Sequence, residues 1–565
     1  MTTDIQAPQT APLAPLADGE RIEALDVVRG FALIGVLIMN VEFFNRAGAE
    51  NGSGMQAGLH GIDLWVASFV AYFVIGKFWT TFSLLFGMGF GVMFTRAQAA
   101  GRSFLRPYLR RVAALAVFGA LHYVLLWSGD ILFSYAAGAI ALLVVLYGRA
   151  RPILLAVAGF GLVAVVPGNQ WAGMPIVCLC IASVAAMFMR AEVMVRIKGR
   201  SVPLLAVVTL AIGASLALGV GVAWLLPHGS REARIYLPVV AFNVLVLGIL
   251  MARFHQSAAA RARRAGVGLY VFFVFSMCGV GAVTYLAPLP AEPQPIAASV
   301  LATKSAAEQK RLKDAVDKAA QSKADKARDL KEHEANVAKE TRILSRGSYR
   351  EALAMRAEHF VKRIPRAAGF ASLLMGIFLL GFWFVRSGVM ADTRAHLPLF
   401  RKLALFGLPL GIGLGLLGSL VAVRATPGLD NDGWMLASSL RMLGNLPASV
   451  GYASLVIVMM HSAGVFRHVR VLAPFGRMAL TNYLSQSLIA STFFFAHGFG
   501  LWGISHAWQM VYVAGVLALQ IPLSHWWLAR FRYGPLEWVW RAFTYWQLPP
   551  MRLAPRWPAT GAARA

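Results

Sequence analysis

The chain has 565 residues, of which 58% are hydrophobic and only 14% are charged. Ordinary domain cores cannot bury that much apolar surface, so the composition excludes a soluble globular protein and predicts a polytopic membrane protein. The formal net charge of +27 is typical of nucleic-acid-binding proteins. Here, however, the basic residues fall mainly in short gaps between apolar runs, where they act as topology signals and favour anionic lipid headgroups. We therefore expect the lipid bilayer as a partner, and no nucleic acid.

Apolar runs near the length that a bilayer requires predict an all-α fold, a polytopic transmembrane helical bundle of about 12–14 spans. The candidates are residues 26–44, 74–95, 112–128, 130–147, 152–167, 173–189, 203–226, 235–252, 267–287, 367–385, 403–423, 436–461, 478–496 and 507–528. Two short runs, 130–147 and 152–167, can instead be re-entrant or merged with a neighbour. Residues 62–74 are apolar but interrupted by polar groups, so they either extend the second span or lie along the outer interface.

The loop charges orient the spans. With the N-terminus inside, the predicted outside loops other than 288–366 carry only four basic residues, Arg46, Arg231, Arg234 and Arg424, and the inside loops carry the rest. Positive residues gather on the cytoplasmic side of membrane proteins. We therefore expect both termini to be cytoplasmic.

The chain divides into five parts. Residues 1–20 and 547–565 are predicted to be disordered tails, flanking transmembrane blocks at 21–287 and 367–546. Between the blocks, a Pro-rich exit leads into an Ala/Lys/Glu/Asp-rich stretch, which predicts a charged, largely helical periplasmic insertion over 288–366. The insertion is a solvated arm by its composition, although a lid or a homo-oligomerisation role remains open. The three cysteines, Cys178, Cys180 and Cys278, lie in apolar runs and indicate neither disulfides nor a metal site.

The first span has polar groups at both ends. Asp26 and Arg29 lie at its inner end, where they form an i,i+3 ion pair or leave Arg29 facing the bundle to bind an anion. Asn40 and Glu42 lie at its outer end, and Asn40 can equally join helices by hydrogen bonding. In the second span, Lys77 either reaches the outer interface or pairs with a carboxylate, Glu42 or Asp63.

The stretch 110–140 contains a second polar group. Arg110 and Arg111 mark the inner end of a span, and His122 follows roughly 17 Å further along the helix. A hairpin at Ser128-Gly129 can fold Asp130 back onto His122, which would orient the imidazole as a base. The alternative is a structural histidine with Asp130 as a helix N-cap.

The entrance of the span at 478–496 is unusually polar. Its side chains either join helices or line a cavity open to the cytoplasm, and the candidates for ligand contact are Asn482 and Gln486.

Three segments resemble the YeiB-like family of bacterial multi-pass membrane proteins. They are LDVVRGFALIGVLIMN at 25–40, RRVAALAVFGALHYVLLWSGDIL at 110–132, and the pair PFGRMALTNYLSQS at 474–487 with GPLEWVWRAFTY at 534–545. The last pair resembles the family's C-terminal domain of unknown function. Through the D-x-x-R-G-x-A pattern of the first span, the family is distantly similar to transmembrane acyltransferases. Those enzymes place a histidine just beyond that span, whereas this chain has Asn40 there.

This resemblance implies an acyltransferase that moves an acyl group from a cytoplasmic donor such as acyl-CoA, with no tightly bound cofactor, to an envelope glycan or small-molecule acceptor. Because the histidine of those enzymes is missing here, His122 is proposed in its place from position alone. With Asp130 it would act as the base, Asn40 and Glu42 would complete the catalytic group, and Arg29, Arg110 and Arg111 would contact donor phosphates. Two other classes remain open: a small-solute transporter that uses the same polar residues as a pathway, and a non-catalytic membrane partner that assembles through 288–366.

Overall fold

The computed structural model describes residues 21–48, 58–166, 170–189, 193–197, 199–225, 231–286, 305–423 and 433–553. The predicted tail at 1–20 and the Pro-rich exit lie outside these residues, as do 554–565. Residues 547–553, which belong to the second predicted tail, are described. They lie beside residues 530–532, and Phe531 and Arg552 form an antiparallel bridge.

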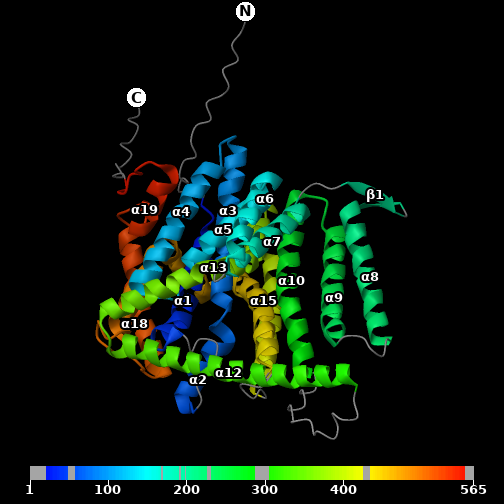
Figure 1. The fold of residues 1–565 in the computed structure, drawn as a ribbon. Helices are drawn as coiled ribbons and strands as arrows, with labels where there is room; N and C mark the ends of the chain where they lie inside the picture. The colour runs from blue at the N-terminus through cyan, green and yellow to red at the C-terminus, as the bar shows by residue number, and fades with distance from the viewer. Residues whose placement is uncertain are drawn as a thin grey trace, which may run out of the picture.

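The structure is an all-α bundle, as predicted from the apolar runs (Figure 1). In lipid, every backbone polar group must be satisfied within its own segment, so apolar runs of this length become helices. The helices are α1 Glu23–Phe44, α2 Gly61–Phe69, α3 Lys77–Ala99, α4 Leu105–Leu121, α5 Leu132–Tyr147, α6 Ala150–Val165, α7 Gly173–Met189, α8 Leu204–Leu225, α9 Arg231–Arg253, α10 Ala258–Leu286, α12 Ala306–Arg346, α13 Tyr349–Arg386, α14 Leu397–Val423, α15 Trp434–Met460, α16 Leu472–Arg477, α17 Ala479–Phe494, α18 His506–Leu528 and α19 Pro535–Tyr545.

Shorter elements connect these helices. Two π-helical turns, η3 Val70–Val74 and η4 His122–Leu126, follow α2 and α4, and 3-10 turns cover Gln170–Ala172 and Gly464–Val471. Strands β1 Met194–Ile197 and β2 Arg200–Pro203 form an antiparallel hairpin between α7 and α8, with Val195 opposite Val202.

Within the described residues, ten helical stretches are long and apolar enough to cross a membrane, and α5, α6 and α7 are shorter apolar helices. Each of the fourteen predicted runs coincides with a helix. Residues 61–99 form one apolar stretch that is broken at Ile75–Gly76 into α2 with η3 on one side and α3 on the other. The chain is therefore a multi-pass membrane protein.

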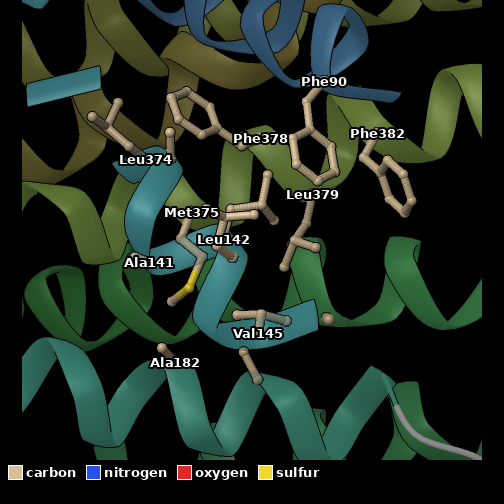
Figure 2. Packing of buried hydrophobic residues seen from close by; sticks show 14 of the residues in the cluster. Phe90, Ala141, Leu142, Val145, Ala182, Leu374, Met375, Phe378, Leu379 and Phe382 are labelled. Atoms are coloured by element: carbon tan, nitrogen blue, oxygen red, sulfur yellow. The ribbon is translucent and has the colours of Figure 1, made fainter. Parts of the chain in front are cut away.

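Helix α13 is the centre of the bundle. Its residues Leu374, Phe378 and Leu379 are completely buried, and they pack against side chains of α3, α5 and α7 (Figure 2). Phe378 stacks on Phe86 with ring centroids 4.7 Å apart. The helix begins with a capping box, in which Ser348 and Glu351 bind each other's backbone amides. It then runs without a break from the predicted insertion into the membrane block.

Helix α12 lies across the end of the bundle opposite α19 (Figure 1). Two apolar residues of α12 lie in different environments, because Leu330 is 58% exposed whereas Leu344 is 5% exposed. Ile343 and Leu344 pack with the C-terminal end of α1 and with Phe494 and Phe495, and the backbone amide of Ala496 donates to Leu344 O at 2.8 Å. The last turns of the helix are therefore attached to the bundle.

Helices α3 and α13 cross at a glycine contact. A methyl group at Gly381 would lie 2.1 Å from the carbonyl oxygen of Leu84, so this position accepts no side chain without separating the two helices. We expect Gly381→Ala to lower the free energy of unfolding by about 1–3 kcal/mol and to lower the Tm measured by thermal unfolding in detergent. Gly515→Ala is the control, since a methyl group there meets no neighbouring atom. Equal Tm values for the two variants would contradict this packing.

Candidate functional site

A cavity of about 560 Å³ lies between α1, α3, α4, α5, α13, α17 and α19. Its middle is apolar, with side chains such as Leu25, Phe86 and Leu115. One end is lined by six arginines and two carboxylates, namely Arg21, Arg29, Arg96, Arg111, Arg477, Arg541, Asp26 and Glu537. Toward the other end it is lined by Asn40, Asp130, Tyr135, Arg363 and Tyr483. Such a chamber fits a molecule with an anionic head and an apolar body.

The arginines of the basic end are held in place by neighbouring side chains. Arg29 forms an ion pair with Asp26 at 2.7 Å, and both residues line the cavity, so anion binding by Arg29 stays a prediction. The Arg111 guanidinium lies 3.9 Å from the centroid of the Trp540 ring. Arg541 stacks on the ring of Tyr533 in the same way, at 4.6 Å. Stacked guanidinium groups keep their charge while losing conformational freedom.

Glu537 fastens α19 to the start of α17. Its carboxylate accepts hydrogen bonds from the backbone amide of Leu480 at 2.7 Å and from the hydroxyl of Thr481 at 2.6 Å. Burial raises the pKa of Glu537 above its ordinary value, and the hydrogen bonds from Thr481 and Leu480 oppose that rise. Because Glu537 holds α19, it also holds Trp540 and Arg541 at the basic end.

His122 and Asp130 are brought together where α4 ends. The helix changes to the π-helical turn η4, the chain reverses, and His122 Nδ1 lies 2.9 Å from Asp130 Oδ1. Both side chains are completely buried. The second carboxylate oxygen accepts from the amide of Phe133 in the first turn of α5, at 2.9 Å, although the N-cap residue of that helix is Ile131. The structure therefore contains the predicted contact of Asp130 with His122, and the role of the pair as a base stays a prediction.

This arrangement leaves one nitrogen of His122 available. When Asp130 is ionised, the imidazole proton is on Nδ1, and this N–H donates a hydrogen bond to the carboxylate. Nε2 is then a hydrogen-bond acceptor. Among the described residues Nε2 has no hydrogen-bond partner, although it is buried. The ring lies 5.1 Å from the ring of Tyr483, which lines the cavity, whereas His122 itself does not line it. Tyr483 therefore separates the imidazole from the chamber.

Two arginines of α13 complete the turn, and the sequence did not point to them. Arg363 donates to the carbonyl oxygens of Asp130 at 2.6 Å and Ser128 at 3.3 Å. Arg356 donates to the carbonyl oxygens of Val124 at 2.9 Å and Leu125 at 3.2 Å. These carbonyls belong to the turn after α4, where regular helix bonding stops, so the arginines satisfy acceptors that would otherwise be left in the membrane interior.

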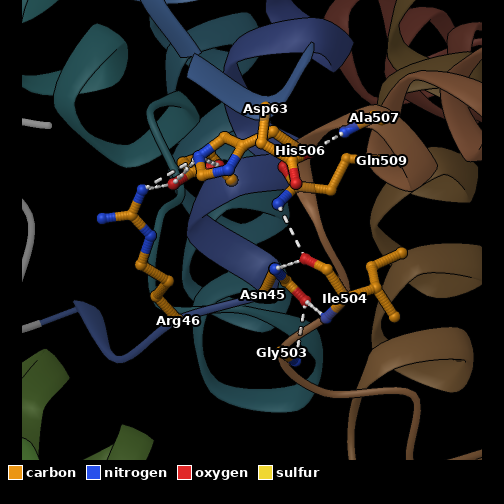
Figure 3. A network of polar contacts seen from close by, with 9 residues as sticks. Asn45, Arg46, Asp63, Gly503, Ile504, His506, Ala507 and Gln509 are labelled. Carbon is orange, nitrogen blue, oxygen red and sulfur yellow. Dashed lines mark hydrogen bonds and ion pairs between the residues drawn. The ribbon is translucent and has the colours of Figure 1, made fainter. Parts of the chain in front are cut away.

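Glu42 lies in a different network at the C-terminal end of α1. It forms an ion pair with Arg46 and lies within hydrogen-bond distance of His506 Nε2, 3.2 Å away, and Arg46 also contacts that histidine. The neighbouring Asn45 binds the backbone of Gly503 and Ile504, and Asp63 of α2 accepts from the amide of Ala507 (Figure 3). Glu42 does not line the cavity. The network ties α1, α2 and α18 together.

The other proposed site residues divide between the cavity and the helix contacts. Asn40 lines the cavity. Arg110 is exposed and lies over Trp546, outside the chamber. Asn482 donates to Phe475 O and Ser524 Oγ, both at 3.0 Å, and Gln486 donates to Gln520 at 2.9 Å. These two amides therefore join helices in the structure.

The role of Arg363 can be tested by its removal. Arg363→Ala leaves the carbonyls of Ser128 and Asp130 without these donors, so we expect the free energy of unfolding to fall by about 2 kcal/mol or more. Lys362→Ala is the matched control: its side chain is exposed and pairs only with Glu358, and such surface pairs contribute little. Thermal unfolding in detergent measures both. A loss in the control as large as in Arg363→Ala would refute the assignment.

The comparisons with known proteins agree with the motifs. The family described as "Protein of unknown function (DUF418)" matches residues 384–547. Uncharacterized protein YxaH of Bacillus subtilis (strain 168) is 25% identical over 546 residues, which cover 95% of this chain and 97% of YxaH.

Two shorter matches accompany this one. Uncharacterized protein YeiB of Escherichia coli (strain K12) is 33% identical over 174 residues, 30% of this chain and 44% of YeiB. An uncharacterized 39.9 kDa protein in the amylase 3' region of Bacillus acidopullulyticus is 35% identical over 123 residues, 22% of this chain and 33% of that protein. No solved structure matches the chain. The chain thus matches the DUF418 family over residues 384–547, is similar to YxaH over nearly its full length and to YeiB over part of it, and has the helices of a multi-pass membrane protein.

Proposed function

We propose that the chain is a transmembrane acyltransferase that moves an acyl group from an anionic cytoplasmic donor, of which acyl-CoA is the class to test first, to an acceptor in the cell envelope. The observation that supports the proposal is that Asp130 belongs both to the contact with His122 and to the lining of the cavity. Its carboxylate binds His122 and also lines a cavity whose opposite end is basic. A carboxylate-oriented imidazole with a free nitrogen is the usual arrangement of a general base.

In the proposed step, His122 Nε2 takes the proton of an acceptor hydroxyl or amine as that group attacks the thioester carbonyl. The bond from acceptor to carbonyl carbon forms, the carbon–sulfur bond breaks, and the thiolate leaves with the proton returned by the imidazolium. Asp130 stabilises the imidazolium, and Asn40 donates to the carbonyl oxygen. Because Tyr483 lies between His122 and the chamber, its side chain has to rotate before the step.

The basic end would hold the donor. Arg29 and Arg111 line it together with Arg541, and guanidinium groups bind phosphate oxygens in a bidentate manner. Arg111 and His122 are eleven residues apart, so roughly 17 Å along α4 separates the basic end from the imidazole, enough to separate a charged head from a reacting carbonyl. Arg110, Asn482 and Gln486 lie elsewhere and take no part. Glu42 acts through the outer network.

The orientation follows from the same charges. We place the chain in the bacterial inner membrane with both termini in the cytoplasm, because basic residues gather at the ends of the helices predicted to be inside. The basic end of the cavity then opens toward the cytoplasm, where a phosphate-bearing donor is available. The turn at His122 and Asp130 lies toward the envelope side.

One observation favours a second candidate function, transport of a small amphipathic anion. His122 is completely buried and does not line the cavity, so a solute can occupy the chamber without meeting the imidazole. In that case the His122–Asp130 pair closes the end of the chamber and performs no chemistry. Removal of the imidazole distinguishes the two functions.

We expect His122→Ala to lower kcat for acyl transfer by about 100-fold or more, because a general base contributes at least that factor. The measurement is release of CoA from radiolabelled acetyl-CoA by purified protein in lipid nanodiscs, with bacterial envelope glycans as acceptors. His468→Ala is the control, since this histidine is exposed and bonds only the nearby Val465 carbonyl. Bound acetyl-CoA without turnover in the native protein would instead support the transporter.

A second prediction concerns the basic end. Arg541→Gln should weaken donor binding by about tenfold and raise KM more than it lowers kcat, because it removes a charge that meets the head of the donor and not the reacting carbonyl. Arg530→Gln is the control, as this exposed arginine stacks on Trp526 outside the cavity. Equal donor affinity in the two variants would show that α19 does not contribute to donor binding.

A further inference from the structure

A second group of charged residues lies where α3 begins, away from the cavity. The apolar stretch 61–99 is long enough to cross the membrane, but Ile75–Gly76 interrupts it. Gly76 has φ +85°, a backbone conformation that glycine adopts most easily. Helix α3 starts at Lys77, the next residue, and no side chain caps it. The result is a discontinuous membrane helix, with the positive end of the α3 dipole inside the apolar stretch.

The carbonyl groups at this break have partners. Tyr452 donates to Phe73 O at 3.1 Å, and Ser449 donates to Lys77 O at 2.6 Å. Thr80 and Thr81 of the first turn donate to Gly76 O and Lys77 O. Hydroxyl groups of α15 and of α3 therefore donate to these three carbonyl oxygens. Two cations and a side-chain amide nearby lack such partners among the described residues.

The first of these charges is Lys77. Its side chain is only 2% exposed, yet its ammonium group makes no hydrogen bond or ion pair with any described residue. The carboxylates offered by the sequence are engaged elsewhere: Glu42 pairs with Arg46 and His506, and Asp63 accepts from Ala507. A buried ammonium group in an apolar segment without a counter-charge is strongly unfavourable.

The second charge increases the imbalance. Arg441 of α15 is the charged neighbour whose field acts on Lys77, and its Nε is buried without a hydrogen-bond partner in the described chain. One helical turn further on, Asn445 packs its amide against Gly76, is 8% exposed, and leaves its Oδ1 unbonded. Two cations and a side-chain amide thus converge on the uncapped start of α3.

Glycines of α14 leave room for these side chains. A methyl group at Gly415 would lie 3.7 Å from Lys77 Nζ, and one at Gly418 would lie 3.2 Å from Arg441 Cγ. Both cations therefore extend against the same face of α14, one turn apart. Lys77, Arg441 and Asn445 are absent from the lining of the large cavity, so this group of residues is separate from the proposed acyl-transfer site.

We propose that the break at Gly76 is an anion-binding site, in which one compact negatively charged group is bound by the Lys77 ammonium, the Arg441 guanidinium and the free amides of the first turn of α3. An anion there neutralises two like charges and completes the uncapped helix at once. The N-terminal ends of broken membrane helices bind anionic groups in the same way in transporters. The ligand is a free small anion or the headgroup of an anionic lipid, since both present the same charge.

The test is the Tm of the full-length protein, measured in phosphatidylcholine nanodiscs at constant ionic strength. Chloride, acetate or phosphate replaces gluconate in one series, and phosphatidylglycerol replaces part of the lipid in the other. We expect at least one of these anions to raise Tm in a saturable manner. Lys77→Met and Arg441→Met should each raise the apparent dissociation constant at least about tenfold or abolish the response. Lys402→Met and Arg401→Met, on the exposed start of α14, should respond like the native protein.

The two series separate the sources of the ligand. A rise with chloride, acetate or phosphate identifies a free anion, and a rise with phosphatidylglycerol alone identifies a lipid headgroup. A native protein with the same Tm in every anion and lipid overturns the proposal, and this result needs no variant that may fail to fold. Retention of the full response in both Lys77→Met and Arg441→Met overturns it as well. Neither result bears on acyl transfer, which is measured separately.

Discussion

Backbone carbonyls that lose their helical partners inside a membrane must find donors, and this constraint explains how the bundle is organised. The chain interrupts helices at two places within apolar stretches, after α2 at Ile75–Gly76 and after α4 at His122–Asp130. At the first break, hydroxyl groups of α15 donate to the free carbonyls. At the second, guanidinium groups of α13 do so. Each unpaired carbonyl would otherwise cost several kcal/mol, so the positions of α13 and α15 are fixed by the breaks they complete.

Helix α13 has two roles in this organisation. Its second half is buried at the centre of the bundle, where Leu374 and Phe378 contact several helices at once. Its first half lies over the turn that holds His122, with Arg356 and Arg363 bonded to the backbone of that turn. The helix also continues from the charged insertion. One helix therefore contacts both the turn at Asp130 and the core of the bundle.

The sequence predicted what depends on local pattern. Apolar length placed a helix at each of the fourteen runs, and the separation of eight positions from His122 to Asp130 allowed a hairpin that brings them together. No local sequence pattern indicated the contacts between segments that are distant in the chain. Arg363 lies more than two hundred residues from the carbonyls it binds, and its sequence neighbours place it in a charged arm. Charge alone also could not show that Arg111 lines the cavity while the adjacent Arg110 points away from it.

The long separation between Asp130 and Arg363 also constrains how the protein is made. Chains are synthesised from the N-terminus, so η4 and the following turn leave the ribosome before α13 does. During that interval the carbonyls of Val124, Leu125, Ser128 and Asp130 lack the guanidinium groups that later bind them. Water or an assisting protein has to satisfy them until α13 has been synthesised. Final assembly of the His122 turn is therefore a late event in biogenesis, and it depends on the arrival of the first half of α13 at this turn.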